Sequence, residues 1–291
     1  MTETVTRTLA STGATITYDV RGAAAGSEAR PALLLIGSPM DATGFTTLAS
    51  HFPDRTVVTY DPRGAGRSVR TDGVAEHLPV EHAEDLRRVI EAVGLGPVEI
   101  FASSGGAVNA LALVAAHPEL VSTLVAHEPP VVPVLPDAEV VGALCTDIHA
   151  TYLRAGSGRA MAKFFEALGV RGEFPADWLS RPAPDPAAFG LPAEDDGTRG
   201  DPLLGQNMRG CTGYRPDAEA LRAAGTRIVP AVGKESEGQF PARAAVALAG
   251  ELGREPAVFP GDHGGFLGGE YGQHGEPEAF AQTLRAVLDQ A

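Results

Sequence analysis

The chain has 291 residues, 44% of them apolar, so it can bury a large core as one domain with an insertion or as two small domains. Its 37 acidic and 23 basic residues leave a formal net charge of -14, which argues against phosphate backbones and anionic membrane surfaces as partners. We therefore expect a small-molecule substrate, no nucleic acid and no membrane partner, and we leave a homodimer as an open alternative.

The beginning of the chain and its cysteines point to a cytoplasmic protein. Residues 1–10 lack a basic segment followed by an apolar one, and no later run approaches the roughly 18 apolar residues that a membrane helix needs. Cys145 and Cys211 lie far apart, without a C-x-x-C or Cys/His spacing. We interpret both as small buried hydrophobic residues, and we expect no disulfide framework, no metal and no cofactor.

Strands and helices are predicted to alternate through the first 130 residues. Two antiparallel strands are expected within residues 4–20, followed by a loop over 23–27. Apolar runs then predict buried strands over 32–36, 55–60, 97–101 and 121–126. Between them, periodic apolar positions predict helices over 43–52, 80–93 and 107–117.

The alternation stops at Pro129-Pro130 and returns after Asp217. The intervening stretch predicts helices over 140–154 and 159–168 among proline-rich and glycine-rich loops. The last part predicts a helix through Leu221, strands over 227–232 and 257–259, and helices over 241–252 and 277–288. We expect an α/β fold with a mostly parallel, eight-stranded sheet and helices on both faces, in which residues 1–130 and 217–291 form the core domain and 131–216 an inserted, mostly helical cap.

The clearest chemical signal lies at residues 98–109. An apolar strand runs into Ala102-Ser103-Ser104-Gly105-Gly106 and then into a helical pattern. This order matches the nucleophile elbow G-x-S-x-G, a strained turn that holds a serine at the carboxyl edge of a sheet, with Ala102 as the first small residue. The alternative is a glycine-rich loop whose serines only cap the helix. The pattern favours Ser104 as a nucleophile.

A serine nucleophile needs a base, and His263 is the candidate. It follows the last predicted strand, where a loop at the carboxyl edge can bring it to Ser104. His274 lies in a polar loop. Five other histidines lie in or beside helical patterns and are expected at the surface: His51, His77, His82, His117 and His149.

With these residues in place, the chain resembles the α/β-hydrolase superfamily, as a cap-containing member with a serine nucleophile. Residues 36–40 (Ile-Gly-Ser-Pro-Met) look like the family's H-G-x-P oxyanion loop, with Ile36 where histidine is common. Residues 60–68 look like its D-x-R-G-x-G-x-S turn. The serine precedes the histidine, as in that family. The resemblance implies that the backbone N–H groups of Ser38 and Gly105 form the oxyanion hole, and that Asp61 and Arg63 are structural.

The acid of the triad stays open between positions. The resemblance implies an aspartate about three residues after Gly233, but Ser236 stands there, flanked by Glu235 and Glu237. Some members place the acid after the sixth strand instead, where this chain has Glu128. We favour Glu128, with Glu235 or Glu237 as the next choice and Asp262 or no acid as the last.

These residues predict a serine hydrolase that cleaves an ester, lactone or thioester of a medium-sized, largely apolar substrate through an acyl-enzyme. Apolar residues of the expected cap line its pocket or form its core: Met161, Phe164, Phe165, Trp178, Leu203, Met208 and Tyr214. The same triad could serve as a cofactor-free perhydrolase or haloperoxidase-like enzyme, a carbon-carbon bond hydrolase, or a biosynthetic acyltransferase or cyclase. A non-catalytic ligand-binding protein of this fold is a further alternative. Ser104 argues against the relatives that use an aspartate nucleophile.

Overall fold

The computed structural model describes residues 3–23, 26, 30–74 and 76–290. The loop expected over 23–27 lies largely outside these residues. Within them, a sheet of nine strands has the order β1-β2-β4-β3-β6-β7-β8-β9, and β5 pairs with β2 off this path. The strands are β1 (Thr4–Ser11), β2 (Ala14–Arg21), β3 (Leu33–Ile36), β4 (Val57–Tyr60), β5 (Val69–Arg70), β6 (Val98–Ser103), β7 (Val121–His127), β8 (Arg227–Gly233) and β9 (Ala257–Phe259).

The sheet is mostly parallel, as the sequence predicts. β1 and β2 pair antiparallel, β2 pairs antiparallel with β4, and the strands from β4 to β9 along the path are parallel to their neighbours. The path holds the eight expected strands. β5 was not expected, because two residues are too few to show any alternation of apolar and polar positions.

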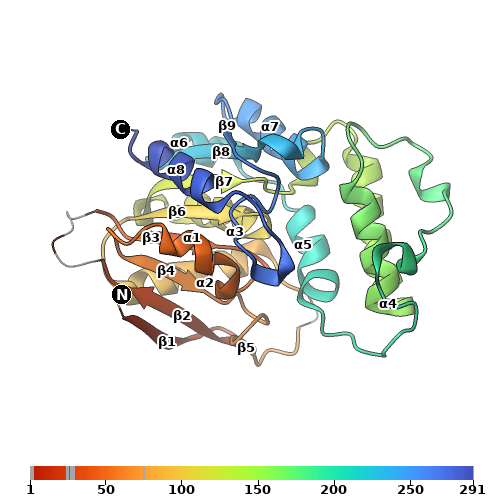
Figure 1. The fold of residues 1–291 in the computed structure, drawn as a ribbon, viewed down its shortest axis with the longest axis horizontal. Coiled ribbons are helices and arrows are strands. Elements are labelled where there is room, and N and C mark those ends of the chain that lie inside the picture. The colour runs from red at the N-terminus through yellow and green to blue at the C-terminus, as the bar shows by residue number, and fades with distance from the viewer. Residues whose placement is uncertain (1–2, 24–25, 27–29, 75, 291) are drawn as a thin grey trace.

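Helices cover both faces of this sheet (Figure 1). Alternate residues of β3 belong to different apolar clusters. Leu33 and Leu35 pack with α1 (Thr46–Ser50) and α8 (Pro277–Leu288), whereas Leu34 and Ile36 pack with α2 (Pro79–Val93) and α3 (Gly105–Ala116). Both faces are therefore buried, which explains the continuous apolar run of this strand. The core helices are α1 (Thr46–Ser50), α2 (Pro79–Val93), α3 (Gly105–Ala116), α6 (Ala218–Ala223), α7 (Phe240–Glu251) and α8 (Pro277–Leu288).

Residues 131–216, the proposed insertion, are called the inserted segment below and contain two further α-helices of the described residues. Figure 1 shows α4 (Ala138–Leu168) and α5 (Met208–Thr212) together at one end of the sheet. The two helices expected over 140–154 and 159–168 are the two parts of α4, which meet at the non-helical backbone of Gly156, with φ 83° and ψ 178°. A π-helical turn, η6 (Pro202–Asn207), leads into α5. We retain residues 131 and 216 as the proposed limits of a cap.

The remaining features of the fold concern the two cysteines and whether any helix could cross a membrane. Cys145 and Cys211 are both free and buried, which confirms their interpretation as small buried residues. No helix in the described part of the chain combines the length and the apolar character needed to cross a membrane.

Candidate active site

Ser104 lies between the end of β6 and the start of α3. Its backbone has φ 57° and ψ -128°, in the left-handed half of conformational space that residues with a side chain rarely adopt. The Ser104 N–H donates to the His127 carbonyl at 2.9 Å, and the Ser104 carbonyl accepts from the Ala107 N–H at 3.0 Å. The surrounding hydrogen bonds thus hold a strained serine at the strand-to-helix turn that the sequence predicts.

The two glycines after Ser104 allow the start of α3 to pack against the loop that follows β3. A Cβ atom on Gly105 would lie 2.4 Å from the Ser38 carbonyl oxygen, and one on Gly106 would lie 2.7 Å from Gly37 Cα. Neither position has room for a side chain. The close contact places Ser38 beside Gly105. The Gly105 N–H lies in the first turn of α3, where N–H groups have no acceptor within the helix.

His263 and Glu128 meet from two different loops. His263 Nδ1 lies 2.5 Å from Glu128 Oε2, and Glu128 Oε1 accepts from the Gly233 N–H at 2.8 Å. The Glu128 side chain is fully buried, and its backbone has a φ of 47°. The Glu128 N–H donates to the Ala231 carbonyl. A strained backbone and three hydrogen bonds therefore hold this carboxylate against the imidazole.

The other candidate acids do not reach His263. Glu235 and Glu237 are exposed, and Ser236 between them is buried, with an Oγ that has no hydrogen-bond partner. Asp262 is also exposed, and its carboxylate accepts from the Gly264 N–H. Of the carboxylates considered from the sequence, the structure brings Glu128 to the imidazole.

The charges of the pair shift both pKa values. Burial opposes the ionisation of Glu128, but the hydrogen bond and charge of His263 outweigh it and lower the carboxyl pKa to about 2. Burial also lowers the pKa of His263, but the hydrogen bond and charge of Glu128 outweigh it and raise the imidazole pKa above its ordinary value of 6.5. The pair can therefore stabilise a proton that His263 accepts.

A cavity of about 250 Å³ joins these groups. Ser104 and His263 both line it, and among the described residues no hydrogen bond joins their side chains. Catalytic hydrogen bonds are often formed only once substrate is bound. The rest of the lining comes from the loop 37–40, from Ser103, Gly105, Pro130, Phe240, Pro241 and Phe266 of the core, and from Phe164, Leu168, Leu203, Asn207, Met208, Cys211 and Thr212 of the inserted segment.

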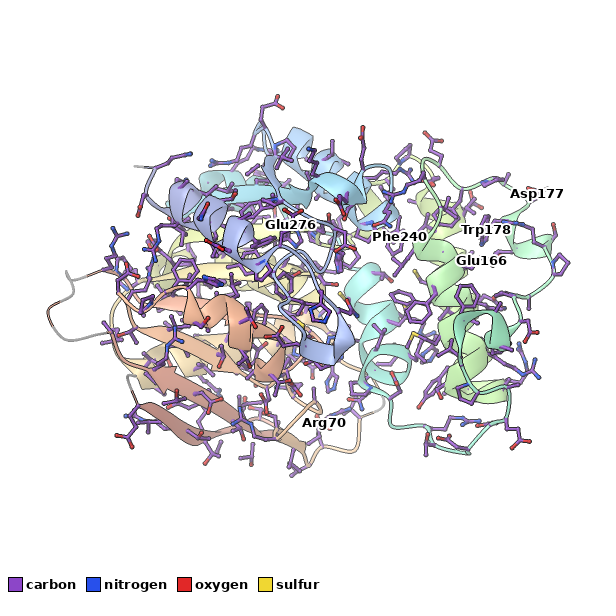
Figure 2. The ribbon with its side chains drawn as sticks, in the orientation of Figure 1. Arg70, Glu166, Asp177, Trp178, Phe240 and Glu276 are labelled. Atoms are coloured by element: carbon purple, nitrogen blue, oxygen red, sulfur yellow. The ribbon has the colours of Figure 1, made fainter. Side chains whose placement is uncertain are left out.

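The apolar residues expected in the cap divide between the pocket, the core and the surface, where Phe165 is exposed. Phe164, Leu203 and Met208 line the cavity, whereas Met161, Phe165, Trp178 and Tyr214 do not. Trp178 instead packs edge-to-face on Phe174. Figure 2 shows Trp178 on the segment that follows α4, and Phe240 at the start of α7. Helical spacing alone did not separate the two roles, because it identifies a buried face without saying what lies opposite.

His127 is a site residue that the sequence reasoning missed. It is fully buried directly before Glu128, its Nδ1 lies 3.2 Å from Ser103 Oγ, and its ring stacks on that of His263 at 6.0 Å between centroids. Burial lowers its pKa to about 4, so it stays neutral beside His263 and Glu128. Its place in a buried strand next to a candidate acid is the signal that could have identified it.

Asp61 and Arg63 hold loops, although not by pairing with each other. Asp61 accepts from the Ala42 N–H at 3.0 Å and pairs with Arg67 at 2.7 Å. Arg63 makes a two-pronged ion pair with the buried Asp85, with N–O distances of 2.7 and 2.8 Å. These contacts fit the structural role expected of both residues.

Three histidines expected at the surface are buried, so that expectation was wrong. His77, His82 and His149 are 1%, 1% and 7% exposed, while His51 and His117 are partly exposed. Each buried ring contacts the same part of the inserted segment: His77 Nε2 lies 2.9 Å from Gln206 Oε1, His82 Nε2 lies 3.1 Å from Asn207 Oδ1, and His149 Nδ1 lies 2.7 Å from the Leu204 carbonyl. A distant segment covers them, which no local pattern could indicate. Among all the described residues, these histidines included, no group of three or more His, Cys, Asp or Glu side chains is arranged to hold a metal ion.

Comparisons with known proteins agree with the fold. The family model for the alpha/beta hydrolase fold matches residues 31–144. The uncharacterized hydrolase YraK of Bacillus subtilis is 31% identical over 265 residues, which cover 89% of each chain. Among solved structures, a thermophilic esterase from Thermogutta terrifontis has a TM-score of 0.66 at 18% identity over 98% of each chain. The proline iminopeptidase of Mycobacterium smegmatis has a TM-score of 0.62 at 15% identity, also over 98% of each chain.

Proposed function

We propose that this chain, which belongs to the alpha/beta hydrolase family and is a hydrolase, cleaves an ester, lactone or thioester through an acyl-enzyme formed on Ser104. The observation that carries the proposal is the contact of His263 Nδ1 with the buried carboxylate of Glu128, beside a cavity that Ser104 and His263 both line. An imidazole held through Nδ1 leaves Nε2 to exchange protons with a nucleophile.

In the proposed mechanism, Ser104 Oγ attacks the substrate carbonyl while His263 Nε2 takes its proton. Glu128 accepts the Nδ1–H and stabilises the imidazolium. The negative oxygen of the tetrahedral intermediate accepts hydrogen bonds from the backbone N–H groups of Ser38 and Gly105. His263 then gives its proton to the leaving oxygen or sulfur, and the acyl-enzyme forms. Water repeats the sequence with His263 as base, which releases the acid and restores Ser104.

The cavity supports a small to medium-sized, neutral and largely apolar substrate. Its described lining holds no Asp, Glu, Lys or Arg side chain, so a charged group on the substrate would lose its hydration without a partner. Removal of an N-terminal proline from a peptide requires a site for a protonated amine, which favours esters over such peptides. The volume of about 250 Å³ is slightly below the roughly 300 Å³ at which pockets for drug-sized ligands begin, which favours short acyl groups.

Labelling with a fluorophosphonate probe tests the proposal, because such probes react with activated serines. We expect the probe on the Ser104 peptide of the wild-type protein and no label in Ser104→Ala. Ser103→Ala is the matched control, since Ser103 is the adjacent serine at the same cavity, and we expect it to keep the Ser104 label. Label on Ser103, or none on either serine under conditions that label a reference esterase, would contradict the proposal. A non-catalytic binding protein would give the second result.

Turnover of para-nitrophenyl esters tests the substrate class. We expect hydrolysis of the acetate and butyrate, and lower kcat/KM for the octanoate and for an ester with a carboxylate on its acyl chain. Equal or faster turnover of the charged ester would show that the neutral cavity does not set specificity.

A further inference from the structure

Asn207 lies where the inserted segment meets the expected oxyanion loop. It is the last residue of η6, is 5% exposed and lines the cavity. Its Oδ1 lies 3.1 Å from His82 Nε2 and 3.4 Å from Ser38 Oγ, and its Nδ2 donates to the Pro202 carbonyl at 2.8 Å. One amide thus connects the core helix α2, the loop 37–40 and the inserted segment.

The hydrogen-bond partners determine which atoms donate. The Pro202 carbonyl can only accept, so it faces the Asn207 NH₂ group and the amide oxygen is left to accept from the other two partners. His82 therefore carries its proton on Nε2, and its buried Nδ1 has no hydrogen-bond partner in the described part of the chain. Burial lowers the His82 pKa to about 3, which keeps the ring neutral. His82 is a fixed donor, and the Ser38 hydroxyl completes the pair of donors to Asn207.

Several contacts hold Asn207 in this position. Asp201 accepts from the Leu203 and Leu204 N–H groups at the start of η6, and the π-helical turn ends at Asn207. π-Helical turns are frequent at functional sites because they redirect side chains within a helix. The His77 N–H donates to the Gln206 carbonyl at 3.0 Å, which joins this turn to the start of α2. These contacts fix the turn that carries the Asn207 amide.

We propose that Asn207, held by His82, is a positioning residue that orients Ser38 in the oxyanion hole. The proposal rests on the proposed function, in which the Ser38 N–H receives the developing negative charge. Backbone donors stabilise that charge only when they lie at about 2.7 to 3.1 Å from it, so small changes in the loop 37–40 reduce their contribution. By accepting from the Ser38 hydroxyl, Asn207 fixes the side chain of the residue that supplies one donor. The inserted segment thereby contributes to transition-state stabilisation as well as to the pocket wall.

Asn207→Leu and Asn207→Asp separate positioning from packing. Leucine has nearly the shape of asparagine but accepts no hydrogen bond, whereas aspartate keeps the acceptor oxygen. The readouts are kcat and KM for para-nitrophenyl butyrate and the Ki of trifluoromethyl propyl ketone, whose hemiketal with Ser104 carries the oxyanion. For Asn207→Leu we expect kcat to fall about tenfold, the Ki to rise by the same factor and KM to change less than about threefold. For Asn207→Asp we expect a smaller fall in kcat and a smaller rise in the Ki. A fall in kcat and a rise in KM by the same factor, with no effect on the Ki, would overturn the proposal.

Gln206→Met is the matched control for anchoring of the segment. Gln206 is the neighbouring residue of the same turn and contacts His77, not Ser38. We expect it to leave the ketone Ki within about twofold. If Gln206→Met weakens ketone binding as much as Asn207→Leu does, the effect comes from the placement of the inserted segment, and the proposed role of Asn207 is refuted.

A double-mutant cycle tests whether Asn207 acts through Ser38. Ser38→Ala keeps the backbone N–H but removes the hydroxyl, so we expect Asn207→Leu to cause no further loss of ketone affinity in that background. Additive losses would contradict the proposal. If Asn207→Leu does not fold, the pair His82→Leu and His82→Gln replaces it, because the glutamine amide can donate where Nε2 does. We expect His82→Gln to retain more ketone affinity than His82→Leu.

Fluorophosphonate labelling distinguishes failure of this inference from failure of the proposed function. Wild-type protein that takes no label on Ser104 would refute the serine mechanism. Wild-type protein that is labelled, together with an Asn207→Leu variant of unchanged kcat and Ki, would refute the role of Asn207 alone.

Discussion

His263 and His82 each make one side-chain hydrogen bond, to Glu128 and to Asn207, and their pKa values shift in opposite directions. His263 faces the Glu128 carboxylate, and His82 faces the Asn207 amide. The pKa of His263 is raised above its ordinary value because the negative charge of Glu128 outweighs burial. The pKa of His82 is lowered to about 3 because burial, together with the charges of His77 and Arg63, outweighs the hydrogen bond with Asn207. An anionic partner thus suits a histidine to proton transfer, and a neutral partner makes it a permanent donor.

The largest expected contrast is between removal of the two imidazoles. His263→Ala should lower kcat/KM for para-nitrophenyl butyrate by about ten-thousandfold or more, because Ser104 would lose its base. His82→Leu should lower it by only about tenfold, since it acts through Asn207 and Ser38. Steady-state kinetics of both variants at one pH checks this order. Comparable losses would mean that the two rings do not differ in role.

Glu128→Gln should have the next largest effect. It keeps the size of the side chain but removes the charge, and a similar change in another triad lowered kcat by about ten-thousandfold. Glu235→Gln and Glu237→Gln are the matched controls, because both carboxylates are exposed, and we expect less than about a twofold change in kcat. A larger loss in either control than in Glu128→Gln would assign the acid elsewhere.

The pH dependence should follow His263 and not His82. His263 accepts a proton only when neutral, so kcat/KM should fall as the pH drops through its raised pKa, at a pH above 6.5. Without the negative charge in Glu128→Gln, this acidic limb should move to lower pH. His82, with a pKa of about 3, should add no limb above pH 5. A profile for the variant that is lower in rate but unshifted would argue against the coupling of Glu128 to His263.

The smallest effect on rate, and the most direct test of the comparison, is expected for Asn207→Asp. A carboxylate next to His82 reproduces the environment of His263, so the pKa of His82 should rise by about one unit or more. Titration of the histidine ring signals by NMR measures this shift, with Gln206→Glu as the matched change beside His77. An unchanged His82 pKa would mean that burial alone sets its charge state.

Much of the fold and two of the site residues follow from local patterns. The order of strands and helices in the core, Ser104 in its strand-to-helix turn and His263 after the last strand are all readable along the chain. They are readable because period and turn chemistry act over a few residues. The two-residue strand β5 is too short to show such a pattern.

The contacts of the site needed the tertiary structure. The choice of Glu128 over Glu235 or Glu237 depends on the contact of Glu128 with His263, which lies 135 positions away in the chain. His82 was expected at the surface because a helical pattern treats a histidine as a polar position. Its partner Asn207 is 125 positions distant.

By itself, the sequence therefore determined the alternation of the core, the elbow at Ser104 and the edge of the sheet on which His263 would lie. Only the tertiary structure decided which carboxylate faces His263, which residues of the inserted segment line the cavity, and that His82 is buried against Asn207. The physical reason is range. Helix period, strand alternation and turn preference are local properties of the chain, whereas burial and charge partners depend on which distant segments pack together.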